Sequence, residues 1–196
     1  MTDEYKTISK NKIGEAYYTE KRSKFLAFAI HVTDVEAIKD IVAAYRRKYY
    51  DARHVCYAYV LGPEGKDFRA NDDGEPSGTA GKPIHGQIVS NGLTDILVVV
   101  IRYFGGVKLG SSGLIVAYRA AAAEAIADAE VENKFVEEVV NYTFTYPMMN
   151  QVMRIVKDMS PRIVSQNFGV NCEISLSIRR SEAAVLKERL DKLSFE

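Results

Sequence analysis

The sequence predicts an α+β protein that folds as two successive units, a larger one at residues 1–133 and a smaller one at residues 134–196. Two observations support this fold class. Along the first two thirds of the chain, the spacing of apolar residues changes repeatedly between the period of a strand and that of a helix. The last third reads as strand, helix, strand, strand and helix, which is most of a ferredoxin-like unit. A polar stretch near residues 131–135 is the expected boundary.

The larger unit is expected to alternate strands with helices in layers. Thr33 followed by Glu36 has the spacing of a capping box and predicts the start of the first helix. The run ILVVVI is continuously apolar, which is typical of a strand covered on both faces. The expected order is strand 24–32, helix 33–49, strand 54–62, helix 83–92, strand 96–101 and a helix from 112 to about 130.

The smaller unit is expected to contain a helix that Pro147 opens and that Ser160 and Pro161 end. This helix has a stripe of methionines, which predicts either a core face or an adaptable contact surface. Only residues 194–196 remain for the strand that would close the ferredoxin-like sheet. The other expected elements are strand 135–146, strands 162–168 and 171–179, and a helix at 182–193.

Composition and charge are those of an ordinary globular protein. The 26 basic and 26 acidic residues balance, which argues against binding to nucleic acid or membrane by bulk charge alone. Cys56 and Cys172 form no CxxC pair, so we expect neither a metal cluster nor a disulfide framework. No signal peptide and no apolar stretch of membrane-spanning length is visible, and we expect a cytoplasmic location without a cofactor.

A polar stretch without large apolar side chains, RANDDGEPSGTAGKP, occupies residues 69–83. Its three carboxylates, Asp72, Asp73 and Glu75, have a spacing that can hold a divalent cation or supply a general base. Asp-Gly and Glu-Pro are also ordinary turn formers, so a solvated turn is the competing interpretation. Two histidines, His54 and His85, flank the stretch in sequence.

A glycine-rich stretch, RYFGGVKLGSSG, follows the apolar strand and leads into a helix. In this setting backbone N–H groups and a helix N-terminus can bind a phosphate. The nucleotide-binding P-loop pattern fails because Ser111 stands where its lysine is required. The stretch is predicted to be either an anion site with Arg102, Lys108 and Arg119, or a tight turn that needs glycine at positive φ.

The motifs HVCYAYVLG, DDGEPSGTAGKP, VVVIRYFGGVKLG and GLIVAYRAA, in this order, resemble the IMPACT family, whose bacterial members are the YigZ-like proteins. The resemblance runs from about Ser23 to Tyr118. It implies a first domain of the left-handed βαβ type found in a ribosomal protein and in translation factors. It also implies a ferredoxin-like second domain similar to one in elongation factor G, and contact with RNA or the translation apparatus.

Three functional hypotheses follow. The first is a non-enzymatic module associated with RNA or the ribosome, with translation-associated proteins as further partners. The second is a hydrolase or other enzyme acting on a phosphorylated small molecule or nucleotide, with Asp72 or Asp73 as metal ligand or base. The third is a protein-interaction regulator that uses the methionine-rich helix.

The candidate site combines the two loops. The expected anion or nucleic-acid contacts are Arg102, Lys108, Arg119, Gly105, Gly106 and Gly110. The expected surface loop beside them consists of His54, Asp72, Asp73, Gly74, Glu75, Pro76, Ser77, Gly78, Thr79 and Gly81. No residue is assigned as catalytic or as a metal ligand.

Overall fold

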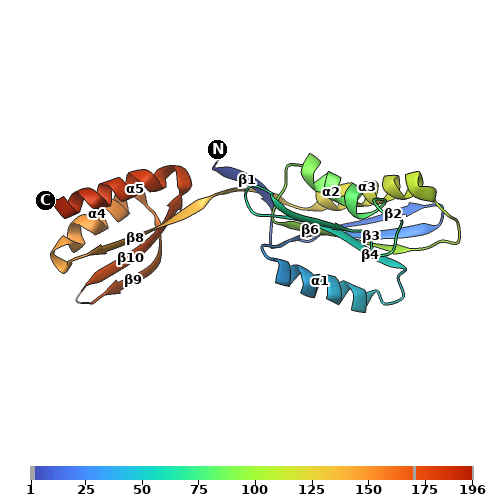
Figure 1. Cartoon of the computed structure of the whole chain (residues 1–196), viewed down its shortest axis with the longest axis horizontal. Coiled ribbons are helices and arrows are strands. Elements are labelled where there is room, and N and C mark those ends of the chain that lie inside the picture. Colours follow the sequence, from blue (N-terminus) through green and yellow to red (C-terminus); the bar gives the residue numbers. More distant parts are fainter. Residues whose placement is uncertain (1–2, 170, 196) are drawn as a thin grey trace. The chain divides into compact units, whose positions relative to one another are not determined.

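A computed structural model describes residues 3–169 and 171–195. By its internal contacts the chain divides into a larger unit, Tyr5–Lys134, and a smaller unit made of Met1–Glu4 and Phe135–Glu196 (Figure 1). Both units mix helices and strands, which confirms the predicted α+β class. Across the described residues, no helix is long and apolar enough to cross a lipid bilayer.

The larger unit is built on a five-stranded sheet in which all neighbouring strands are antiparallel. Its central strand, β6, is the apolar run of the sequence and is buried along almost its whole length. The order across the sheet is β2 (Gly14–Glu20), β3 (Ser23–His31), β6 (Ile96–Tyr103), β4 (His54–Leu61) and β5 (Asp67–Asn71).

Helices cover both faces of this sheet, as the continuous apolar run predicts (Figure 1). α1 (Val35–Lys48) packs on one face, while α2 (Gly81–Ser90) and α3 (Gly110–Asp128) pack on the other. Successive β6 residues alternate between the two cores: Val98 and Val100 face α2 and α3, while Val99 faces α1.

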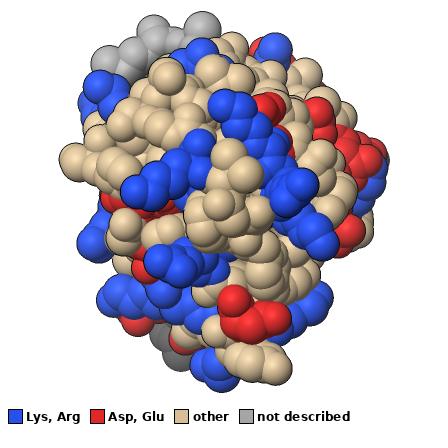
Figure 2. All heavy atoms as spheres, turned by 90° about the vertical axis from the view of Figure 1, so that its right-hand side faces the viewer, with Lys and Arg blue, Asp and Glu red and all other residues tan. Residues whose placement is uncertain are grey.

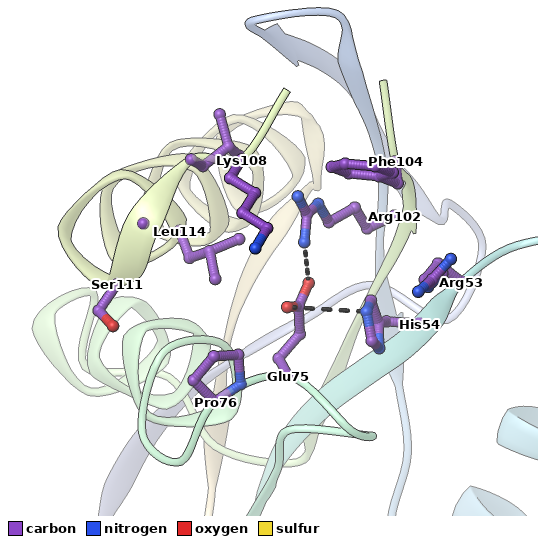
Figure 3. Close-up of a pocket in the computed structure, with 11 residues that line it drawn as sticks. Arg53, His54, Glu75, Pro76, Arg102, Phe104, Lys108, Ser111 and Leu114 are labelled. Atoms are coloured by element: carbon purple, nitrogen blue, oxygen red, sulfur yellow. Dashed lines mark hydrogen bonds and ion pairs between the residues drawn. The ribbon is translucent and has the colours of Figure 1, made fainter. Parts of the chain in front are cut away.

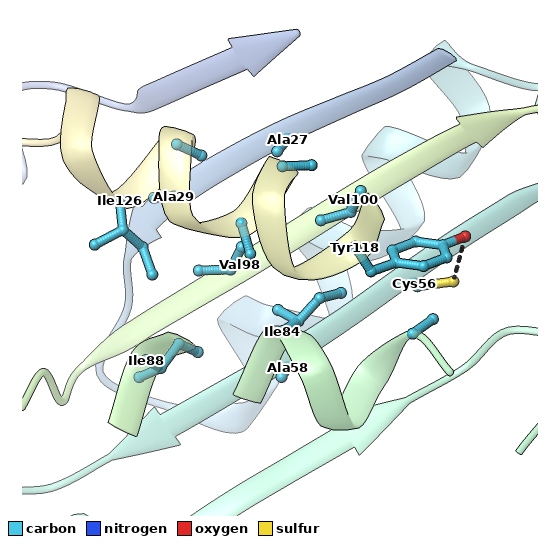
Figure 4. Packing of buried hydrophobic residues seen from close by; sticks show 14 of the residues in the cluster. Ala27, Ala29, Cys56, Ala58, Ile84, Ile88, Val98, Val100, Tyr118 and Ile126 are labelled. Carbon is cyan, nitrogen blue, oxygen red and sulfur yellow. Dashed lines mark hydrogen bonds between the residues drawn. The ribbon is translucent and has the colours of Figure 1, made fainter. Parts of the chain in front are cut away.

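Small side chains let α3 lie close to the sheet (Figure 4). Alanines of the helix, among them Ala117 and Ala121, meet small residues of the strands such as Ala27 and Ala29. Tyr118 is the large exception, and its buried ring packs edge to face on Phe25 with 5.1 Å between ring centroids. Its hydroxyl therefore lies deep inside the unit, next to Cys56 (Figure 4).

Several boundaries differ from the sequence prediction. Asp34, and not Thr33, caps α1, because its carboxylate accepts the N–H of Ala37 at 2.8 Å. α3 begins at Gly110, two residues before the expected start. Four strands were not predicted: β1 (Glu4–Ile8), β2, β5 and β7 (Val131–Phe135), of which β1 and β7 form a separate two-stranded sheet.

The smaller unit has the strand order β8-β10-β9 and the element order expected of a ferredoxin-like unit. The predicted methionine stripe packs, partly buried, against the core of the smaller unit. Leu193–Phe195 forms a 3-10 helix, so the described residues contain no closing strand, and residue 196 lies outside them. Its elements are β8 (Glu137–Phe144), a 3-10 turn (Tyr146–Met148), α4 (Met149–Met159), β9 (Arg162–Phe168), β10 (Cys172–Arg179) and α5 (Arg180–Lys192).

Candidate functional site

The site forms at the end of the sheet where β6 stops and β3 and β4 start. In the antiparallel register Arg102 stands opposite Phe25 on one side and His54 on the other. Two loops lie beside these strand ends. We call residues 72–80 the acidic loop and residues 104–109 the glycine loop. The fold therefore brings together the two motifs that the sequence singles out.

A buried ion pair joins the acidic loop to the end of β6 (Figure 3). Glu75 Oε1 lies 2.7 Å from Arg102 Nη1, and the two side chains are 3% and 7% exposed. The same carboxylate oxygen accepts a hydrogen bond of 2.7 Å from the Tyr118 hydroxyl. Arg102 is therefore committed to a carboxylate inside the protein, and its role as an independent phosphate contact does not fit this geometry.

His54 lies on the other side of the Glu75 carboxylate. Its Nδ1 is 2.8 Å from the backbone carbonyl oxygen of Asp73, which can only accept, so Nδ1 carries a proton. Its Nε2 is 3.7 Å from Glu75 Oε2. The histidine is thus oriented by the acidic loop and presents Nε2 toward the carboxylate (Figure 3).

Beneath Glu75 lies a buried pair of weak acids. Burial raises the pKa of the Tyr118 hydroxyl and also that of the Cys56 thiol. The thiol sulfur is 3.1 Å from the Asp72 carbonyl oxygen and 3.4 Å from the Tyr118 hydroxyl oxygen. Both groups are consequently neutral donors that support the site rather than nucleophiles.

The two aspartates of the acidic loop have structural partners. Asp72 accepts the backbone N–H groups of Gly78, Ala80 and Gly81 at 2.9, 3.1 and 2.8 Å, which closes the loop onto itself. Asp73 accepts the Val55 N–H at 2.7 Å and pairs with Arg46 at 2.6 Å.

These contacts leave the metal-ligand and general-base roles considered for Asp72 and Asp73 without support. In the part of the chain that the structure describes, no three His, Cys, Asp or Glu side chains are grouped to hold a metal ion. The aspartates of the acidic loop instead accept hydrogen bonds from backbone N–H groups, and Asp73 also forms an ion pair with Arg46.

A pocket of about 370 Å³ opens above the ion pair. Its walls combine charged groups with apolar side chains from the glycine loop and from the first turns of α3 (Figure 3). The lining residues are Arg53, His54, Glu75, Pro76, Arg102, Phe104, Lys108, Leu109, Gly110, Ser111 and Leu114.

The pocket gathers some of the predicted site residues and leaves others aside. Arg119 and His85 line a second groove of about 650 Å³ between α2 and α3, so Arg119 does not join Lys108 at the first pocket. Gly78 lines that second groove as well. Arg53 and Phe104 were not predicted, although Arg53 directly precedes His54 in the sequence.

Two glycines of the motifs are required by close backbone contacts. A Cβ at Gly105 would lie 2.1 Å from the carbonyl carbon of Arg22, and one at Gly81 would lie 2.5 Å from the backbone nitrogen of Asn71. Any other residue would push these segments apart. Gly106 and Gly110 have φ of +88° and +72°, as the tight-turn interpretation of the glycine loop predicts.

The surface around the pocket is basic (Figure 2). Basic side chains are spread over much of this end of the larger unit, and the acidic ones on this face gather mainly at its right-hand margin and near its lower edge. They come from the β2–β3 turn, the last turn of α1, the start of β4 and the glycine loop: Lys21, Arg22, Arg46, Arg47, Lys48, Arg53 and Lys108.

The sequence profile of the Impact N-terminal domain matches residues 21–126, which is more than half of the chain and includes both loops of the site. The chain belongs to the IMPACT family. It is 30% identical to IMPACT family member YigZ of Escherichia coli (strain K12) over 178 residues, covering 89% of this chain and 86% of the relative.

Two further matches extend over nearly the whole chain. IMPACT family member YvyE of Bacillus subtilis (strain 168) is 27% identical over 194 residues, covering 99% of this chain and 88% of YvyE. A crystal structure of a hypothetical protein superposes with a TM-score of 0.77 at 26% identity, covering 99% of this chain and 94% of that one. The similarity therefore includes both units.

Proposed function

We propose that this IMPACT family protein is an RNA- or ribosome-associated module in the regulation of translation. Its RNA contacts are the exposed cations at the basic end of the larger unit. The observation that carries this proposal is the gathering of basic residues from four separate segments at the end of the larger unit where the pocket opens, in a chain whose total charge balances. A local cluster of this kind neutralises phosphates without bulk positive charge.

Exposure decides which cations make these contacts. Lys108 and Arg53 are exposed, and neither has an acidic partner among the ion pairs of the described residues. The Arg102 side chain is buried and holds Glu75, so its contribution is to fix the acidic loop against the end of β6. Arg53 and Phe104 also form a cation–π pair at 6.0 Å, a surface on which an unpaired base can stack.

The salt dependence of RNA binding tests the proposal. With a short single-stranded RNA that has hydroxyl groups at both ends, replacing Lys108 and Arg53 by Ala should lower the slope of log affinity against log salt by about 1.4, or ~0.7 per lost phosphate contact. Lys66→Ala is the matched control, because this exposed lysine lies in the β4–β5 turn at the opposite end of the sheet.

Sedimentation with purified ribosomes at low and high salt extends the same test to the ribosome. The double variant should sediment less than the Lys66→Ala control. The proposal is wrong if the unmodified protein binds neither RNA nor ribosomes, or if the double variant keeps the salt slope of the control.

A further inference from the structure

The pocket concentrates more positive charge than its own carboxylate balances. Glu75 is already bonded to Arg102 and Tyr118, while the Lys108 amine points toward the same pair from the opposite wall (Figure 3). Lys108 has no acidic partner among the described ion pairs, and the buried Nε of Arg102 has no hydrogen-bond partner in the described residues. Cations that converge in this way repel one another unless an anion lies between them.

The N-terminus of α3 adds to the same field. This helix has 19 residues and no side-chain cap, and its first residues, Gly110 and Ser111, line the pocket. Its first N–H groups and the Ser111 hydroxyl are therefore available to an anion, and the helix dipole favours negative charge there. Uncapped helix ends beside a lysine are suited to phosphate oxygens.

The remaining walls of the pocket are apolar, and the pocket is large enough for a ligand that carries a further group beside the anion. Pro76, Leu109 and Leu114 line one side, and Phe104, 43% exposed, lines the other. Arg53 and Arg102 lie 6.0 and 5.6 Å from the centroid of the Phe104 ring. A pocket of about 370 Å³ with an aromatic wall fits a flat ring system attached to the anion.

We propose that this pocket binds a nucleotide through a terminal phosphate monoester, with the phosphate between Lys108 and the N-terminus of α3 and the base against Phe104. Two sources share this chemistry: a free mononucleotide and a phosphorylated end of an RNA chain. The RNA version rests on the function proposed above, whereas the free-nucleotide version does not.

The experiment compares ligands that differ only in the phosphate, using the full chain. Adenosine monophosphate should bind at least about tenfold more tightly than adenosine or inorganic phosphate alone, since a charge-assisted hydrogen bond contributes about 1.5–3 kcal/mol. Among short RNAs of one sequence, an oligomer with a phosphate at its 5′ or 3′ end should bind about tenfold more tightly than the oligomer with hydroxyl ends.

Variants locate the site. Lys108→Ala should remove most of the preference for the phosphate, and Phe104→Leu should weaken adenosine monophosphate while leaving inorganic phosphate unchanged. Lys66→Ala is the control and should change neither. Because Lys108, Phe104 and Lys66 are all exposed, none of the three changes is expected to unfold the protein.

The outcomes separate this proposal from the previous one. Binding of adenosine monophosphate without any binding of RNA or ribosomes supports the free-nucleotide source and overturns the proposed function. The pocket proposal is overturned if RNA oligomers with and without a terminal phosphate bind equally tightly and no nucleotide binds at millimolar concentration. The proposed RNA function is then unaffected. Phosphate-dependent binding that survives Lys108→Ala also overturns it, because the phosphate then lies elsewhere.

Discussion

Glu75 and Arg102 stand 27 residues apart in the sequence and form one buried ion pair, with 2.7 Å between Oε1 and Nη1. The pair ties the acidic loop to the end of the central strand, and both partners lie within the residues that match the Impact N-terminal domain. Its position makes it the structural centre of the site, which leads to the first prediction.

Replacing Arg102 by Met should lower the free energy of unfolding by about 3–5 kcal/mol, because Glu75 is then left as a buried carboxylate without its arginine partner. Adding Glu75→Gln should restore part of this loss. Urea unfolding of the single and double variants measures both effects. Lys39→Met, which breaks the exposed Lys39–Glu36 pair, is the control and should change stability by less than about 0.5 kcal/mol. Equal losses for the two pairs would contradict a buried role for Arg102.

Asp72→Ala should destabilise the acidic loop more than Asp72→Asn. Alanine leaves the three N–H groups of Gly78, Ala80 and Gly81 without their acceptor, and each lost hydrogen bond costs about 1 kcal/mol. Asparagine keeps one acceptor oxygen. Amide hydrogen exchange should become faster in residues 78–81 of the alanine variant. Unchanged exchange there would show that the carboxylate does not hold the loop.

Cys56 should be unreactive toward thiol reagents in the folded protein. The thiolate is the reactive form, and burial raises the pKa of this thiol. In a Cys172→Ser variant, labelling with an aromatic disulfide reagent at mildly alkaline pH should begin only at urea concentrations that unfold the larger unit. Labelling without urea would mean that the chain around Tyr118 opens readily.

Asp128→Asn should change how stability depends on pH. A hydrogen bond from the Glu15 N–H and the nearby Lys12 amine hold the pKa of Asp128 below its ordinary value of 3.8. The charged carboxylate therefore stabilises the folded protein fully above that value, and this contribution is lost as the pH falls below it. The variant should be less stable than the unmodified protein at about pH 6, and the difference should shrink at about pH 3. A difference that does not vary with pH would rule out this linkage.

A fragment of residues 1–135 should unfold cooperatively in urea by itself, because it keeps the five-stranded sheet, both cores beside it and the whole of β1 and β7. In the full chain, the larger unit should then unfold at the same urea concentration as the isolated fragment. An unfolded fragment beside a stable full chain would show that the larger unit depends on residues 136–196.

The sequence predicts the centre of the fold better than its edges. The continuous apolar run is typical of a strand covered on both faces, and it is the central β6. β5 was missed because every residue but one is exposed, so its apolar spacing indicates no buried face. At α1, Thr33 and Asp34 are both good capping residues, and only the observed bond from Ala37 N–H to Asp34 decides between them.

The site could be predicted as two loops but not as a set of side-chain directions. Because β6 is apolar on both faces, no alternation reveals that Arg102 points to the same side as Val98 and Val100, toward α2 and α3. Arg119 was expected beside it, yet Arg119 directly follows Tyr118, which points into the core, and it therefore turns toward the second groove. The sequence alone also could not show that Asp72 uses its carboxylate on backbone further along its own loop.

That last contact affects how a ligand would bind. Three backbone N–H groups held by Asp72 mean that the glycine-containing stretch has already lost its conformational entropy on folding. A ligand that meets this wall orders little further chain, so more of its contact energy remains as affinity. The stretch 72–81, rich in small side chains, is thus a preorganised surface. A ligand should bind to it without a slow rearrangement of the loop.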